Sequence, residues 1–178
     1  MPKLTIYEGS KAMALDNQWL KNEIEKMGFP CAVSLFAGTE KSCVLVSLGQ
    51  GPDKEPQSMQ LWLEPQQSEL GKDLSLLQIF MPICKFQAAF LGDVASLVLN
   101  VNVGLDVPGF GVSAADKYVY YRTTTFMSEP TALTVLQTLM GLTMTYVDGF
   151  SAVINSIASG KKNYKQAVDD LMKAAQGV

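Results

Sequence analysis

The side chains best suited to chemistry in this sequence are three cysteines, Cys31, Cys43 and Cys84. A thiolate can act as a nucleophile or a metal ligand, but it usually needs a basic partner or further ligands at fixed spacing. The chain contains no histidine, and each cysteine lies in an apolar run: CAVSLFA, SCVLVSL and FMPICKF. We therefore predict buried thiols in a reducing compartment, with no disulfide, no metal ion and no organic cofactor.

Catalysis without histidine would need a lone cysteine or a serine–lysine pair. Cys84 and the lysine that follows it lie in an apolar run at a predicted strand-to-helix junction. The acidic pairs Glu23/Glu25 and Asp169/Asp170 lie on predicted helices, where residues one or two apart do not converge on one site. The segments GQGPDKEP and PGFGVS lack the features of a phosphate-binding loop and are predicted to form turns. We predict that the protein is not an enzyme.

Charge and composition exclude one large class of partner. The net charge is −3 and the sequence pI is about 4.9. Arg122 is the only arginine and the lysines are scattered, whereas a nucleic-acid-binding protein carries a clustered basic surface. Only 17% of the residues are charged and 48% are hydrophobic. This composition predicts no nucleic acid, and it indicates apolar surface that meets another protein.

The sequence also bears on location. Its start, MPKLTIYEGS, has no apolar core of a secretory signal, which predicts a cytoplasmic protein. Residues 130–147 carry no charge, which reaches the length of ~18 residues typical of a short membrane span. Threonines and a glutamine interrupt this stretch, and Asp148 follows it directly. We predict a buried helix there and no membrane partner.

The spacing of apolar residues predicts the elements that must position these side chains. Helices are expected at 16–27, 86–100, 129–158 and 164–175, and the first could begin as early as Ser10. Strands are expected at 31–37, 42–48, 58–64, 74–81, 110–113 and 118–127. Runs of strands followed by helices indicate an α+β fold with a mostly antiparallel sheet. We predict a single domain over residues 1–178, with an additional C-terminal helix at about 163–175.

The expected helix at 129–158 is apolar over most of its circumference. Such a helix must be buried on more than one side, which predicts a homodimer, with cover by the chain's own final helix as the alternative for part of this surface. Leu136, Met140 and Met144 are the predicted interface residues. Methionine is common on adaptable binding surfaces, but an ordinary core role for Met140 and Met144 is the alternative.

A partner-binding surface is predicted on the sheet and the neighbouring first helix. Trp62 alternates with Met59 and Leu61, so it must point to the opposite face of its strand, and one of the two sets faces away from the main core. Arg122 and Tyr120 could anchor a partner by stacking or ion pairing. The alternatives are a sheet that helices cover on both faces and an ordinary surface arginine.

The order of elements resembles the type III secretion chaperone-like fold, and YbjN-type bacterial proteins in particular. The resemblance covers about residues 14–158. It rests on GFP at 28–30, LVLN at 97–100 with its Asn100, PGFGVSAADKYVYYRTTTF at 108–126 and the long helix. The chain departs from that pattern in its longer, threonine-rich third helix and its added final helix. The resemblance implies a small, acidic, cytoplasmic, usually dimeric bacterial protein that holds extended client segments in apolar grooves, with no catalytic residues to carry over.

Three functional hypotheses follow. The first is a chaperone-like module that holds a segment of a partner protein on an apolar surface. The second is a regulatory or assembly adaptor that binds a folded partner without chaperone activity. The third is an enzyme with a cysteine or lysine nucleophile, which loss of turnover in Cys84→Ala would support.

Overall fold

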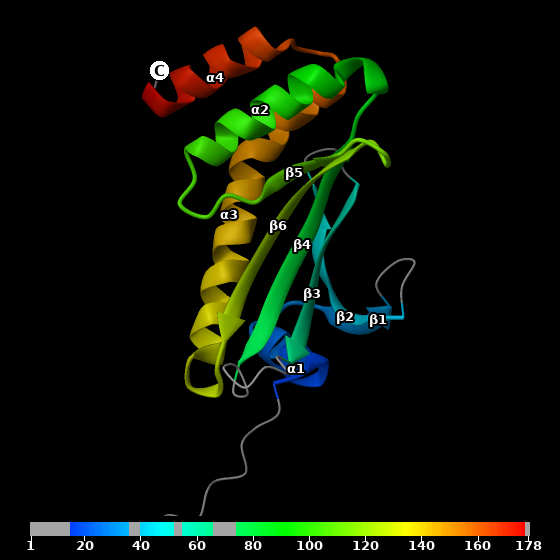
Figure 1. The fold of residues 1–178 in the computed structure, drawn as a ribbon, viewed down its shortest axis with the longest axis vertical. Helices are drawn as coiled ribbons and strands as arrows, with labels where there is room; N and C mark the ends of the chain where they lie inside the picture. Colours follow the sequence, from blue (N-terminus) through cyan, green and yellow to red (C-terminus); the bar gives the residue numbers. More distant parts are fainter. Residues whose placement is uncertain (1–14, 36–39, 52–54, 66–73, 177–178) are drawn as a thin grey trace, which may run out of the picture.

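The computed structural model describes residues 15–35, 40–51, 55–65 and 74–176 (Figure 1). The elements follow the order expected from the sequence, which confirms the α+β class. The helices are α1 (Asn17–Lys26), α2 (Leu91–Val103), α3 (Ala132–Ala158) and α4 (Tyr164–Gln176), with the short 3-10 helices η2 (Ala88–Phe90) and η3 (Glu129–Thr131) before α2 and α3. The strands are β1 (Cys31–Leu35), β2 (Ser42–Gln50), β3 (Pro56–Pro65), β4 (Ser75–Lys85), β5 (Phe110–Ser113) and β6 (Tyr118–Met127).

A local cap sets the start of α1, and a contact between distant residues sets the start of the second helical segment. The Asp16 carboxylate accepts the backbone N–H of Trp19 at 2.8 Å and caps α1. The sequence placed the second helix from residue 86, but Phe86 instead donates its N–H to the Lys117 carbonyl at 2.9 Å. Because Phe86 still contacts the β5–β6 turn, the helical segment begins only at η2. Ser10 lies outside the described residues, and so do residues 66–73 between the expected strands at 58–64 and 74–81.

The six strands form one antiparallel sheet in the order β1-β2-β3-β4-β6-β5. β6 pairs with β4 over its whole length, so the β5–β6 hairpin places its longer strand inside the sheet and its shorter strand at the edge. Pairing between β3 and β4 runs from Pro65–Ser75 to Gln60–Phe80 and stops there.

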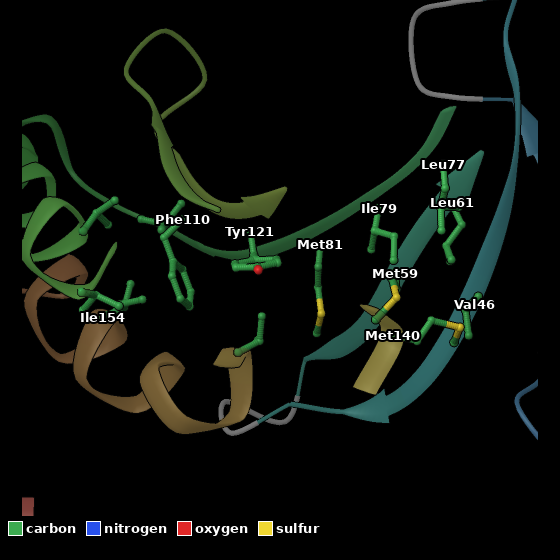
Figure 2. Close-up of a cluster of buried hydrophobic side chains, with 14 of the residues drawn as sticks. Val46, Met59, Leu61, Leu77, Ile79, Met81, Phe110, Tyr121, Met140 and Ile154 are labelled. Carbon is green, nitrogen blue, oxygen red and sulfur yellow. The ribbon is translucent and has the colours of Figure 1, made fainter. Parts of the chain in front are cut away.

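The sheet is strongly curved, and its concave face carries the core (Figure 2). Alternate residues of each strand point to this face, and they form cross-strand rows such as Val44, Leu61, Ile79 and Thr123. The Tyr121 hydroxyl donates to the Val107 carbonyl at 2.8 Å, and burial raises the pKa of Tyr121 to about 12. Apart from Cys43 and Trp62, the buried apolar side chains of the described residues form one hydrophobic cluster that reaches from Trp19 to Ala167.

The helices cover the concave face and one end of the sheet (Figure 1). α1 packs on β1, β2 and β3, and α3 packs along β4 and β6. Asn17 joins α1 to two strands, because its amide donates to the Ser42 carbonyl at 2.8 Å and accepts the Leu63 N–H at 3.1 Å. α2 contacts β5 and α3, and α4 lies against α2 and α3.

One stripe of α3 faces the sheet, with Leu136, Met140, Val147 and Ile154 buried in the core. Partly buried apolar residues flank this stripe: Val135, Leu139, Met144, Tyr146, Phe150 and Val153. Apart from Leu133, the exposed side carries threonines, a glutamine, an aspartate and small residues: Thr134, Gln137, Thr138, Thr145, Asp148, Gly149 and Ala152. α3 contacts α2 and α4 as well as the sheet, so its apolar part is buried on more than one side within its own chain. No helix in the described part of the chain is long and apolar enough to cross a membrane.

This geometry corrects the predicted dimer interface. Leu136 and Met140 are 0% and 1% exposed, because they pack beneath the chain's own sheet. They cannot contact a second copy without opening the core. Met144 is half-buried and packs against the same core.

The exposed side of α3 offers a route to higher stability. Gly149 is exposed in the helix interior, and a Cβ built there meets nothing within 4 Å. We expect Gly149→Ala to raise the free energy of unfolding by about 1 kcal/mol, because alanine restricts the unfolded chain and favours helix. Urea unfolding measures the change. Gly141→Ala, equally open on the same helix, is the matched control, and lower stability in both variants would contradict the described packing of α3.

Candidate functional site

The convex side of the sheet, called here the outer face, is the candidate site. Strand pairing places Gln60, Phe80 and Arg122 side by side on it, and Trp62, Gln78 and Thr124 in the next row. α1 and α3 pack on the concave side of the sheet, and α2 contacts β5 at its edge. The outer face carries partly exposed side chains, such as Phe80 and Tyr120, beside nearly buried ones, such as Trp62 and Gln78.

Three aromatic side chains form a contiguous group on the outer face, called here the aromatic cluster. The ring centroids of Phe80 and Tyr120 are 5.4 Å apart, and those of Phe80 and Tyr118 are 6.3 Å apart in an edge-to-face arrangement. Tyr118 and Tyr120 are separated by 5.8 Å. Each ring is partly exposed, so the group combines mutual packing with accessible surface.

Glycine at position 111 permits this arrangement. Gly111 pairs with Tyr120 across the β5–β6 ladder, and a Cβ built on Gly111 would lie 2.5 Å from the Tyr120 ring. The ring therefore lies over the backbone of β5. A larger residue at position 111 would displace Tyr120 from the aromatic cluster.

Arg122 provides an oriented positive charge next to the aromatic cluster. Its Nη2 donates to Gln78 Oε1 at 2.6 Å, and Gln78 is only 5% exposed. Arg122 is exposed, and its guanidinium has five N–H donors of which this hydrogen bond uses one. A buried glutamine thus restrains an exposed arginine.

A cavity of about 400 Å³, called here the splay pocket, opens where β3 and β4 separate. Beyond the Gln60–Phe80 pair, β3 pairs only with β2 while β4 pairs only with β6. Side chains of the outer face and of α3 therefore line one cavity through the gap. Its lining is Gly51, Glu55, Pro56, Gln57, Ser58, Gln60, Phe80, Pro82, Ile83, Cys84, Lys85, Tyr118, Ser151 and Asn155.

A second hollow of about 420 Å³ lies at the β5–β6 edge of the outer face. Tyr120, Arg122 and Gly111 contribute to its lining. Phe80 and Tyr118 also line the splay pocket, so the aromatic cluster lies between two hollows. Burial, with smaller contributions from Asp116 and Tyr120, raises the pKa of Tyr118, which keeps its phenol protonated at neutral pH.

The structure separates the residues that the sequence grouped as a partner-binding surface. Tyr120 and Arg122 do lie together on the outer face. Met59 and Leu61 are 0% exposed on the concave face, so their predicted role in partner binding is wrong. The first helix covers that same concave face and does not border the outer one.

Trp62 does point opposite to Met59 and Leu61, as the alternation predicted. It lies on the outer face but is only 9% exposed, so it offers little surface to a partner. Sequence reasoning missed Phe80 and Gln78, although their alternation with Leu77 and Ile79 could have placed them opposite the core. No sequence signal pointed to Ser151, because its place at the splay pocket depends on where β3 and β4 part.

Cys84 lines the splay pocket together with Phe80 and Tyr118, whereas Cys31 and Cys43 belong to β1 and β2. Cys43 is buried as predicted, and Cys31 and Cys84 are half-buried. Burial raises the pKa of Cys31 and of Cys43, which lowers the fraction of reactive thiolate at neutral pH. Within the described ranges, no group of three or more Cys, Asp or Glu side chains is placed to hold a metal ion.

Comparison of the chain with models of known protein families gave no match, and comparison with curated proteins gave none either.

Proposed function

We propose that this protein is a binding module that holds an extended segment of a partner protein on the outer face of its sheet. The observation that carries the proposal is the aromatic cluster of Phe80, Tyr118 and Tyr120, partly exposed on the side of the sheet opposite the core. Aromatic residues and arginine are the side chains that most often dominate binding energy at protein interfaces. The resemblance described from the sequence implies a role of the same kind.

The chemistry of the outer face favours one type of segment. The aromatic cluster suits an apolar or aromatic side chain, and a guanidinium recognises a carboxylate through paired N–H donors. Arg122 lies beside the cluster and is restrained by Gln78, so its orientation is largely set before binding. The proposed ligand is therefore an extended peptide with an apolar side chain followed closely by an Asp or Glu.

A cross-linking experiment tests this proposal and identifies the partner. A photo-reactive phenylalanine analogue at position 120 is expected to capture the partner in living cells. The same analogue at position 145, on the exposed side of α3, is the matched control. The captured segment, synthesised as a peptide, is then titrated against the purified protein by calorimetry.

Truncation of the anchors should then weaken the peptide strongly. We expect Tyr120→Ala and Arg122→Ala each to lower affinity about thirtyfold, since a truncated anchor costs about 2 kcal/mol. Thr145→Ala should leave the affinity unchanged. If folded Tyr120→Ala and Arg122→Ala bind the peptide as tightly as the parent protein does, the proposed site is contradicted. Binding of the folded partner but not of the peptide would favour the adaptor hypothesis.

A further inference from the structure

The splay pocket contains polar atoms that the protein itself does not satisfy. In the part of the chain that the structure describes, three buried side-chain atoms have no hydrogen-bond partner: Gln60 Oε1, Thr143 Oγ1 and Ser151 Oγ. Two of them, on Gln60 and Ser151, belong to residues that line the splay pocket. Ser151 is 1% exposed, so bulk solvent does not reach its side chain. Buried polar atoms normally have partners, and an unpaired one is costly, so these two require an explanation.

The walls of the splay pocket indicate the size and polarity of a missing partner. Phe80, Pro82, Ile83 and Tyr118 supply apolar surface, and the two unpaired polar atoms come from opposite sides of the sheet. The charged lining residues, Glu55 and Lys85, are exposed side chains. A cavity of about 400 Å³ lies within the range of small-molecule sites, which are mostly apolar with a few placed polar groups.

From these observations we propose that the splay pocket binds a small uncharged molecule that carries an amide, or a similar adjoining donor and acceptor, on an aromatic or aliphatic body. The Gln60 carboxamide has a donor and an acceptor side by side, and so does an amide ligand, so the two pair in either orientation of Gln60. The Ser151 hydroxyl donates or accepts as the ligand requires. The apolar body lies against Phe80 and Ile83. This site shares Phe80 and Tyr118 with the aromatic cluster, but its test needs no partner protein.

The extent of the pocket favours a free molecule over a single protein side chain. A neighbouring cavity of about 730 Å³ along the C-terminal half of α3 shares Glu55, Ile83, Cys84, Lys85 and Asn155 with the splay pocket. Space therefore continues from the gap in the sheet to the last turns of α3. The two connected cavities together have room for a molecule larger than one side chain.

Titration with three simple probes tests the proposal. Benzamide carries the ring and the amide, acetophenone keeps the shape and the acceptor but has no donor, and toluene has neither. Nuclear magnetic resonance of the isotope-labelled protein follows the Gln60 side-chain amide and the Ser151 and Asn155 backbone amides. We expect benzamide to shift these signals with a Kd on the order of 1 mM, a value usual for a fragment of this size. Acetophenone should bind about fivefold more weakly, the usual effect of one lost hydrogen bond.

Two variants on α3 separate contact with the ligand from effects on packing. Ser151→Ala should raise the midpoint of thermal unfolding, because it removes an unpaired buried hydroxyl and favours helix, and it should weaken benzamide about fivefold. Thr143→Val is the matched control, since Thr143 is equally buried and unpaired on the same helix but does not line the splay pocket. It should leave benzamide affinity unchanged. Absence of shifts at these amides, equal affinity in Ser151→Ala, or an equal loss in Thr143→Val would overturn the proposal and leave a pocket that holds only water.

Discussion

Replacing Leu136 with alanine is expected to lower the free energy of unfolding by about 3 kcal/mol. Leu136 is 0% exposed in the core between α3 and the sheet, and truncating a buried leucine removes apolar contacts and leaves a cavity. Urea unfolding, followed by the fluorescence of the buried Trp19 and Trp62, measures the loss. Leu133→Ala is the matched control, because Leu133 lies one turn earlier on α3 and is 42% exposed. It should change stability by less than about 1 kcal/mol.

The same experiment separates a core role for α3 from an interface role. If Leu136 packs only within its own chain, the unfolding midpoint depends on protein concentration to the same extent, or not at all, in the protein and in Leu136→Ala. A dimer held together through this stripe would unfold at higher denaturant as concentration rises. Concentration dependence that disappears in Leu136→Ala would contradict the core role. Homodimer formation itself stays a prediction, and light scattering at micromolar concentrations tests it.

Replacing Asn102 with alanine is expected to destabilise the β5 edge and the whole protein by about 2–3 kcal/mol. The Asn102 amide donates to the Phe110 carbonyl at 2.8 Å and accepts the N–H groups of Gly109 and Phe110 at 3.1 and 3.0 Å. Its loss leaves three partly buried backbone groups without a partner, at about 1 kcal/mol each. Thermal unfolding and amide hydrogen exchange at Phe110 measure the global and local effects.

Two further variants make this prediction specific. Asn102→Asp keeps the acceptor for both N–H groups but sets a carboxylate oxygen against the Phe110 carbonyl, so it should be as damaging as alanine. Asn100→Ala removes an exposed asparagine from the same helix, where its amide contacts the Tyr164 hydroxyl, and should cost less than about 1 kcal/mol. Equal losses for Asn100→Ala and Asn102→Ala would show that Asn102 has no special role in holding β5.

The contrast between these asparagines shows a limit of sequence reasoning. Asn100 stood out in the sequence because it ends an apolar run, yet the structure gives the structural role to Asn102. The reason is the exact end of α2, at Val103, which places residue 102 next to the turn into β5. The sequence placed that end three residues too early, although Val101 continues the apolar stripe and Gly104 is the C-cap residue.

The outer face shows a second limit. Alternation along β3 and β6 predicted that Trp62 opposes Met59 and that Tyr120 and Arg122 share a face, and both hold. It could not tell which face the helices cover, because a period of two distinguishes the faces without identifying either one. Trp62 and the opposed residues Met59 and Leu61 were therefore all candidates for the partner-binding surface. Gln78, from another strand, was not connected with Arg122 at all.

The sequence by itself determined the type and order of the elements and the β5–β6 hairpin, because these depend on spacing and turn residues within one segment. Only the tertiary structure decided that β6 pairs with β4, that the sheet curves around its apolar face and that β3 and β4 separate beyond Gln60. Those outcomes depend on contacts between residues far apart in the chain. The aromatic cluster and the splay pocket exist only through such contacts, since Phe80 and Tyr118, or Gln60 and Ser151, meet only after the chain has folded.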